Sequence, residues 1–384
     1  MPVFSCGGMR YQHKWQDCPL SEVPSDNQEN LEATIRRSVE LGINHIETAR
    51  GYGSSERQLG QILPEFPRDE LIVQTKIQPH ADPSVFVSQF EESLERLHLD
   101  RVDLLAIHGI NNHELLWWSV REGGCLQAAR VLVDQGKARH IGFSTHGSCD
   151  VIKTAVECEQ FGGFDYVNLH WYYIFQQNWP AIEAAAARDM GVFIISPSEK
   201  GGMLFKPPQK LVDLCQPLHP LVFNCLFCLS HPQVHTLSVG ASKPEDFELQ
   251  LTSLKLFEKA NELVPPVVER LQQAMVDAVG EVAATRFTEG LPPWDLTPGC
   301  INIPTILWLR NLAIGLDLVD YAKMRYNLLG NGEHWFPGVG AAMASQLDLT
   351  KTVANSPLKD EIPGWLTEAH ELLFEAHKKR LSES

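Results

Sequence analysis

The chain has 384 residues, and 44% of them are hydrophobic, which is enough for a large buried core and long for one domain. We therefore expect a barrel-sized unit with an extension. The formal charge of −16 argues against nucleic acids and anionic membranes as main partners.

Two further features of the sequence concern the compartment in which the protein works. No apolar run reaches membrane-spanning length, and the first residues lack the basic and apolar blocks of a signal peptide. We expect a cytoplasmic protein with no membrane partner. The nine cysteines are scattered along the sequence, and in a long cytosolic chain such cysteines are mostly reduced thiols. The pair Cys225 and Cys228 lies in an apolar helical run, which favours core packing over a metal site.

Apolar, strand-like runs alternate with helical patterns from the start of the chain to about residue 260. Strands with nearly continuous apolar sequence indicate a buried parallel sheet. The predicted strands are Val3–Met9, Ile43–Thr48, Leu71–Lys76, Val102–His108, His140–Thr145, Tyr166–Trp171, Val192–Pro197 and Thr236–Gly240. Eight such units in one run are typical of the α/β class with a (β/α)₈ TIM barrel, which we expect over residues 1–260.

Helices are predicted between these strands, and a different pattern follows them. The first helix is expected at Asn27–Leu41, with Asp26 as its N-terminal cap and Gly42 just after its end. The others are predicted at Glu56–Leu63, Pro83–Leu97, Leu126–Gln135, Cys149–Gln160, Trp179–Met190, Pro217–Ser230 and Pro244–Leu256. Residues 261–384 are predicted to form a helical C-terminal extension, with helices at Leu263–Phe287, Pro304–Leu329 and Trp365–Leu381.

The candidate chemistry begins in the stretch from His45 to Gly60, HIETARGYGSSERQLG. A strand ends at Glu47 there, and a glycine-rich loop carries Tyr52 into the next helix. Lys76 ends the third strand and His108 ends the fourth. Each of these residues has an ordinary structural explanation when it is taken alone. Together they face one mouth of the barrel, where (β/α)₈ enzymes keep their catalytic groups.

At these positions the sequence resembles the aldo-keto reductases. The usual family pattern is Asp-Thr-Ala-x-x-Tyr-Gly, then a strand-end lysine and a strand-end histidine. Here it reads Glu47-Thr48-Ala49-Arg50-Gly51-Tyr52-Gly53, then Lys76 and His108. The resemblance covers roughly residues 1–260 and implies NAD(P)H-dependent reduction of a carbonyl. Tyr52 would then be the general acid, with its pKa lowered by Lys76, while Glu47 would hold Lys76 and His108 would orient the carbonyl.

Glu47 departs from the family, whose acid at this position is nearly always aspartate. The carboxylate is kept, but its side chain is one methylene longer. We expect Glu47 to retain the pairing with Lys76 and to alter the rate or the substrate preference.

The resemblance also implies positions that hold the nicotinamide end of the cofactor. These are Ser144 and Thr145 after the fifth strand and Asn168 on the sixth, and Gly8 at the end of the first strand is expected near the cofactor. For Ser144 and Thr145 the alternative is that they cap the helix predicted at Cys149–Gln160.

Two later segments resemble the parts of the family that hold phosphates and adenosine. The loop SPSEKGGM would lie over the pyrophosphate with Ser196, Gly201 and Gly202, because glycines allow backbone N–H groups to approach a phosphate. Ser242 and Lys243 begin the last barrel helix, an anion site in which a lysine favours NADPH over NADH, and Gln250 would meet the adenine.

The extension resembles the ferredoxin-like tail of a bacterial branch of the family. The matching segments are Gly299–Pro304 (GCINIP), Lys323–Gly338 and Ser356–Pro363. Cys300 is the single cysteine of the extension, and one thiolate does not hold a cluster, so we expect a degenerate tail without an iron–sulfur cluster.

The sequence therefore predicts an NADPH-dependent reductase of a small aldehyde or ketone. The alternative is a catalytically weak or inactive NADP(H)-binding sensor or interaction protein, which the changes at secondary positions would favour.

Overall fold

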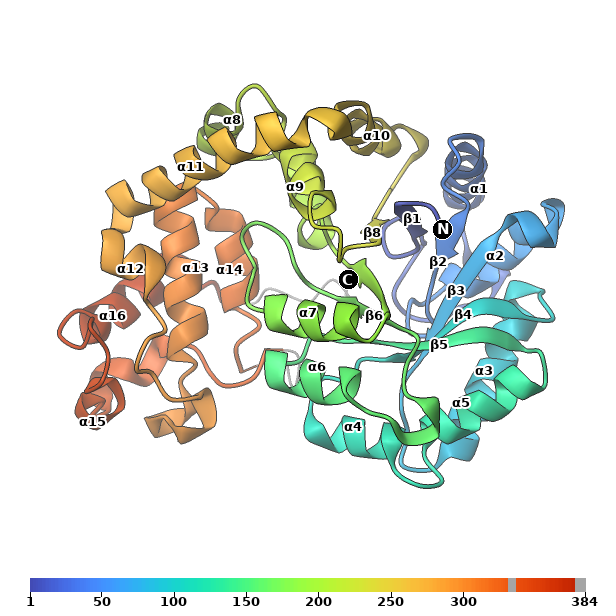
Figure 1. Ribbon diagram of the computed structural model, residues 1–384, viewed down its shortest axis with the longest axis horizontal. Helices are drawn as coiled ribbons and strands as arrows, with labels where there is room; N and C mark the ends of the chain where they lie inside the picture. Colours follow the sequence, from blue (N-terminus) through green and yellow to red (C-terminus); the bar gives the residue numbers. More distant parts are fainter. Residues whose placement is uncertain (331–335, 377–384) are drawn as a thin grey trace. The chain divides into compact units, whose positions relative to one another are not determined.

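Parallel strands close into an eight-stranded barrel in the computed structural model, which describes residues 1–330 and 336–376 (Figure 1). Strand β1 pairs with β2 on one side and with β8 on the other, so the first and last strands complete the closure. The (β/α)₈ prediction is confirmed. The strands are β1 (Phe4–Gly7), β2 (His45–Glu47), β3 (Ile72–Ile77), β4 (Val102–His108), β5 (Ala138–Ser144), β6 (Tyr166–Leu169), β7 (Gly191–Ile194) and β8 (Thr236–Val239).

The barrel interior is filled by side chains from alternate strand positions. Tyr166 of β6 stacks on Phe193 of β7, with ring centroids 5.0 Å apart, and both rings belong to a buried cluster with Leu104 and Ala106 of β4. Gly142 of β5 leaves room for this ring, because a Cβ at that position would lie 2.6 Å from Tyr166. The interior is therefore a packed core rather than a pore.

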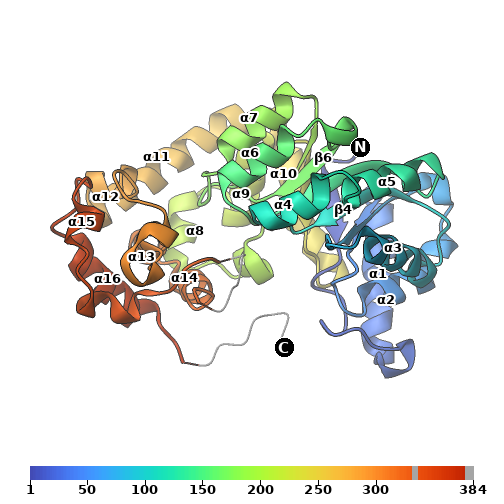
Figure 2. The ribbon, with the colours of Figure 1, turned by 90° about the horizontal axis from the view of Figure 1, so that it is seen from below.

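Helices cover the outside of the strands (Figure 2). They are α1 (Ser25–Glu40), α2 (Ser55–Ile62), α3 (Pro83–Leu97), α4 (His113–Val120), α5 (Cys125–Asp134), α6 (Cys149–Val156), α7 (Trp179–Ala187), α9 (Pro220–Leu229) and α10 (Phe247–Leu256). Helix α4 was not predicted, although its Asn112 cap accepts a hydrogen bond from the N–H of Leu115. Asp26 was wrongly predicted as a cap, because α1 begins one residue earlier, after Pro24.

Packing divides the described chain into two units. One holds residues 1–202 and 224–260, and the other holds 203–223 with 261–330 and 336–376. The domain boundary at residue 260 stays a prediction. The second unit contains α8 (Gln209–Cys215), α11 (Ala260–Val279), α12 (Glu281–Thr285), α13 (Ile303–Leu316), α14 (Val319–Tyr326), α15 (Thr350–Val353) and α16 (Ile362–Leu373).

Two helices predicted as continuous in the extension are broken. Gly280, at φ 85°, separates α11 from α12, and Asp317, at φ 59°, separates α13 from α14. Asp317 adopts the left-handed conformation that ends helices, whereas Gly280 combines its positive φ with a ψ of 153°, a conformation that glycine adopts readily. The last predicted helix is wrong at both ends, since α16 begins at Ile362 and ends at Leu373; Leu381, its predicted last residue, lies outside the described residues.

Helices α13, α14 and α16 pack together in the second unit (Figure 1). Arg310 of α13 is paired with Glu368 of α16 at 2.6 Å, and its guanidinium lies 4.5 Å from the centre of the Trp365 ring. The Tyr326 hydroxyl of α14 contacts His370 Nδ1 at 2.8 Å. Within the described ranges no single helix is long and apolar enough to cross a membrane, and only α8 and α9 taken as a bent pair meet that criterion.

Candidate active site

The strand-end residues meet around the side chain of Lys76. Its ammonium donates a hydrogen bond to Glu47 Oε1, another to the carbonyl oxygen of Thr48 at 3.0 Å, and a third to the Tyr52 hydroxyl at 3.3 Å. These three bonds use all three ammonium protons, so the lysine is fixed. Lys76 and Glu47 are buried, whereas Tyr52 is only partly buried.

His108 completes the group from the end of β4. Its ring meets the Tyr52 ring edge to face, with centroids 5.7 Å apart and an interplanar angle of 83°. The Lys76 ammonium lies 4.8 Å from the centre of the Tyr52 ring. The structure thus places all four residues of the predicted catalytic set side by side, whatever role each one has.

The longer side chain of Glu47 is held by two serines that sequence reasoning missed. Its second oxygen, Oε2, accepts a hydrogen bond from Ser238 of β8 and a longer one, at 3.4 Å, from Ser5 of β1. Gly7 makes room for the Ser238 hydroxyl, because a Cβ there would lie 2.8 Å from it. The signal for both serines was their position on strands β1 and β8, where a small polar residue interrupts an apolar run.

Burial and charge act in opposite directions on the two ions. Burial by itself would raise the pKa of Glu47, but the Lys76 charge and the hydrogen bonds from Lys76 and Ser238 bring it below the usual range. Burial would lower the pKa of Lys76, and Glu47 brings it above the usual range instead. The pair is therefore fully charged at neutral pH.

The expectation that Lys76 lowers the pKa of Tyr52 accounts for only one of the effects that act on this pKa. Lys76 does pull this pKa down, but burial and the negative charge of Glu47 raise it, and the net shift is upward. Burial makes the largest contribution to this upward shift, and the negative charge of Glu47 offsets part of the lysine's effect on the hydroxyl. In this structure Tyr52 is consequently a protonated phenol.

The loop that carries Tyr52 is held by the segment after β1. Gly53 adopts φ 52°, and a Cβ there would lie 2.0 Å from the carbonyl oxygen of Lys14. Ser54 N–H donates to that same oxygen at 3.2 Å. Trp15 meets the Tyr52 ring edge on, with centroids 5.9 Å apart. Sequence reasoning missed Trp15 because its contact with Tyr52 spans 37 positions in the chain.

The three positions predicted at the nicotinamide differ in the hydrogen-bonding capacity that they have left. The Thr145 hydroxyl donates to Ile110 O at 2.7 Å and accepts from Gly147 N at 2.9 Å. Ser144 Oγ accepts from Gly109 N at 3.1 Å. Asn168 is buried, and its Nδ2 has no hydrogen-bond partner among the described residues. Neither Ser144 nor Thr145 caps α6, which begins after Ser148.

The predicted phosphate loop, residues 196–203, overlaps at its end with the 3₁₀ segment Lys200–Phe205. Gly202 adopts φ 77°, and a Cβ there would lie 2.6 Å from the guanidinium carbon of Arg10, a residue that sequence reasoning missed. Arg10 donates to Gly240 O at 2.5 Å and pairs with Asp246 at 3.3 Å. Ser196 also has positive φ, at 57°. Gly8 has a structural role, since its N–H donates to Glu47 O at 2.8 Å.

A carboxylate of the chain itself lies where an anion was expected near α10. Asp246 Oδ2 accepts from the Ser242 N–H at 2.8 Å and from the Ser242 hydroxyl at 2.7 Å. Lys243 is exposed. Gln250 is buried, and its Oε1 has no hydrogen-bond partner within the described ranges. Asn168 Nδ2, a donor, and Gln250 Oε1, an acceptor, fit a ligand with both acceptors and donors, such as a nicotinamide adenine dinucleotide.

Comparison with known proteins places this geometry in a family. A model of the aldo/keto reductase family matches residues 4–262. The chain belongs to the aldo/keto reductase family. Curated relatives include an L-galactose dehydrogenase of Arabidopsis thaliana, 34% identical over 30% of this chain and 39% of its own length, and an aldo-keto reductase of Bacillus subtilis, 32% identical over 31% and 38%. The alignments thus span about two fifths of the length of these relatives.

Solved structures share the fold of this aldo/keto reductase. An aldo-keto reductase from Bacillus halodurans in its holo form has a TM-score of 0.55 at 17% identity, covering 68% of this chain and 91% of that one. A thermostable aldo-keto reductase in complex with the inhibitor epalrestat has a TM-score of 0.56 at 19% identity, covering 69% and 95%. At these identities the likeness concerns the fold.

The cysteines of this family member do not form a metal or disulfide site. All nine lie in the described ranges, and none of them forms a disulfide there. Burial raises the pKa of Cys225 to about 12, and the Cys228 thiol donates to Trp171 O at 3.6 Å, so both pack in the core. Across the part of the chain that the structure describes, no group of three or more His, Cys, Asp or Glu side chains is placed to hold a metal ion.

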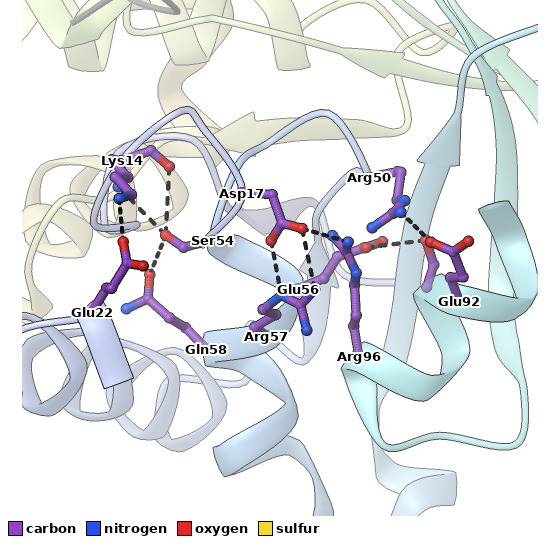
Figure 3. Close-up of polar contacts among 11 residues, drawn as sticks. Lys14, Asp17, Glu22, Arg50, Ser54, Glu56, Arg57, Gln58, Glu92 and Arg96 are labelled. Atoms are coloured by element: carbon purple, nitrogen blue, oxygen red, sulfur yellow. Dashed lines mark hydrogen bonds and ion pairs between the residues drawn. The ribbon is translucent and has the colours of Figure 1, made fainter. Parts of the chain in front are cut away.

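A polar network lies on the outer side of the Tyr52 loop (Figure 3). Asp17 bridges Arg57 at 2.8 Å and Arg96 at 2.5 Å, and Arg50 pairs with Glu92. Both bridged arginines line a surface cavity of about 350 Å³ that none of the strand-end residues lines. This cavity is consequently separate from the candidate active site.

Glu56 is the buried member of this network. It accepts hydrogen bonds from Thr75 at 2.6 Å and from Ser93 at 3.0 Å. Burial raises the pKa of Glu56 to about 7. A carboxyl with a raised folded-state pKa stabilises the fold at low pH, and this contribution is lost as the pH rises through the folded-state value.

The wild type should therefore lose unfolding free energy between pH 5 and pH 8, whereas Glu56→Gln should not lose this contribution. The unfolding free energy of Glu56→Gln relative to that of the wild type is expected to be about 1–3 kcal/mol higher at pH 8 than at pH 5. Urea unfolding at the two pH values measures the difference. The matched control is Glu95→Gln, which removes an exposed carboxylate of α3 and should follow the wild-type profile. An unchanged difference between Glu56→Gln and wild type at the two pH values would contradict the prediction.

Proposed function

We propose that this protein reduces a small aldehyde or ketone to the alcohol, using NADPH as hydride donor and Tyr52 as general acid. The observation that carries the proposal is the 3.3 Å contact between the Tyr52 hydroxyl and Lys76, with Lys76 fixed by the buried Glu47. A tyrosine held this way has its proton at a defined atom beside a fixed positive charge, which suits protonation of a carbonyl oxygen.

Each residue of the site has a defined role in the proposed reaction. Bound NADPH supplies the hydride that adds to the carbonyl carbon. Tyr52 gives its hydroxyl proton to the carbonyl oxygen, and Lys76 stabilises the phenolate that is left. Glu47 keeps Lys76 charged, and His108 orients the carbonyl. The raised pKa of Tyr52 keeps the phenol protonated at neutral pH, the state that a general acid requires.

The cofactor positions in this proposal follow from the family resemblance. Asn168 would bond the nicotinamide carboxamide, beside Ser144 and Thr145, and Gly8 would lie nearby. Ser196, Gly201 and Gly202 would hold the pyrophosphate, with Arg10 as an added positive charge. Ser242, Lys243 and Gln250 would meet the adenosine. Because Asp246 already occupies the Ser242 donors, the preference for NADPH over NADH rests on Lys243.

The activities for which two curated relatives are named support a small carbonyl substrate. The curated relatives include the L-galactose dehydrogenase and a methylglyoxal reductase of Salmonella typhi. The methylglyoxal reductase is 34% identical over 29% of this chain and 41% of its own length.

The C-terminal extension has a separate proposal. We propose that it descends from a ferredoxin-like tail and now has a structural or substrate-gating role. Cys300 is exposed there, and it is the only cysteine beyond residue 228.

A deuterium-transfer experiment tests the proposed function. The purified chain is incubated with NADPH deuterated at nicotinamide C4 and an activated aromatic aldehyde, and the alcohol is analysed by mass spectrometry. We expect deuterium on the carbinol carbon of the product. Binding of NADPH with no labelled alcohol from a panel of aldehydes and ketones would instead favour the sensor or interaction protein.

A further inference from the structure

A chain of hydrogen bonds crosses the barrel interior from β2 to β6. His45 Nε2 contacts Gln74 Oε1 at 3.1 Å, and Gln74 Nε2 donates to Asn168 Oδ1 at 2.8 Å. All three side chains are buried, and His45 and Gln74 have no exposed surface. Neither of these two contacts involves Tyr52, Lys76, Glu47 or His108.

The identity of each donor follows from the chemistry of the groups. Burial lowers the pKa of His45 to about 4, so the ring is neutral and carries one N–H. An N–H on Nε2 donates to the Gln74 carbonyl oxygen, which leaves the Gln74 amino group for Asn168. Gln74 Nε2 also lies 3.5 Å from the Tyr166 hydroxyl, which agrees with the amino group facing β6.

Asn168, the last residue of this series of hydrogen bonds, has a partner for its amide oxygen but none for its amide nitrogen among the described residues. Asn168 Oδ1 is the acceptor for Gln74, so its amide cannot turn over without losing that bond. Its Nδ2 has no partner among the described residues. Buried amide donors without a partner are uncommon and point to a ligand or a water.

We infer that His45 and Gln74 are positioning residues that fix the Asn168 amide with its N–H donors toward the carboxamide oxygen of the nicotinamide. This inference rests on the proposed function, because it needs a nicotinamide next to Asn168. It adds two residues, remote from the reacting atoms, that would set cofactor affinity. Preorganisation of a ligand's partner raises affinity because less freedom is lost on binding.

A double-mutant cycle on cofactor binding tests the inference. The dissociation constant of NADP⁺ is measured by quenching of intrinsic tryptophan fluorescence, so no turnover is needed. We expect Asn168→Ala to weaken binding about tenfold and His45→Leu about fivefold. In the Asn168→Ala background, His45→Leu should have no further effect, because the amide that it orients is gone.

Two further variants separate positioning from a general structural role. The amide nitrogen of glutamine is as many bonds from Cα as His45 Nε2, so His45→Gln should restore binding to near the wild-type value. Gln74→Leu should behave like His45→Leu, and it serves in its place if that variant does not fold.

Each outcome of these measurements has a definite meaning. Additive effects of His45→Leu and Asn168→Ala, or failure of His45→Gln to restore affinity, would overturn the positioning role of His45 and Gln74. The proposed function would remain in place. A wild-type chain that does not bind NADP⁺ would overturn the proposed function, and with it the positioning role of His45 and Gln74.

Discussion

Replacing Tyr52 with phenylalanine is expected to lower the turnover of an aldehyde substrate about 10³-fold while leaving NADPH affinity unchanged. The substitution removes only the hydroxyl, which lies 3.3 Å from the Lys76 ammonium. The ring remains, together with its edge contacts to His108 and Trp15. Steady-state consumption of NADPH and fluorescence titration of the cofactor measure the two quantities separately.

The control for this prediction is another buried tyrosine hydroxyl in the same unit. Tyr11 is buried, and its hydroxyl has no hydrogen-bond partner within the described ranges. Tyr11→Phe should retain most of the turnover. Equal losses in Tyr52→Phe and Tyr11→Phe would show that the hydroxyl of Tyr52 has no special part in the reaction.

The second large effect is expected from Lys76→Met, which leaves the Glu47 carboxylate buried without its positive partner. Removing one member of a buried ion pair typically costs about 3–5 kcal/mol of unfolding free energy. The serine hydroxyls on Oε2 compensate for only a small part of the lost charge. Turnover should also disappear, since the phenolate of Tyr52 would have no counterion. Urea unfolding and NADPH consumption test the two consequences.

The double variant Glu47→Gln with Lys76→Met distinguishes charge from packing. It removes both ions and keeps similar side-chain volumes, so it should recover most of the stability that Lys76→Met loses. It should remain inactive, because stability is restored without the lysine. A single variant as stable as the wild type would mean that Glu47 takes up a proton at no cost, and that the pair contributes little to the fold.

The barrel was predictable from sequence because buried parallel strands are apolar on both faces. Glu47, Lys76 and His108 interrupt those apolar runs near their C-terminal ends, so strand position alone predicted that they would face one mouth. The same logic failed for residues that act through distant partners. Ser238, Trp15 and Arg10 are ordinary in their own segments, and only the closed barrel brings them to Glu47, Tyr52 and Asp246 respectively.

Local signals also misjudged several helix boundaries and one anion site. Asp26 has the residue type of a cap, but α1 starts after Pro24. Ser242, shortly before α10, indicated a phosphate site, yet Asp246 lies four residues later and satisfies both of its donors. Gly280 and Asp317 divide two helices whose apolar periodicity continues across the break. At the anion site, a contact within the chain itself takes up the donors that the local signal assigned to a ligand.

The anchoring of Glu47 connects the chemistry to the order in which the chain can fold. Its carboxylate bonds residues from β1, β3 and β8, and β1 pairs with β8 only at the seam that closes the barrel. A nascent chain that has emerged as far as β7 would carry Tyr52, Lys76 and His108 but would still lack the hydroxyl of Ser238. The ion pair thus receives one of its hydrogen-bond donors from the last strand of the barrel to be synthesised.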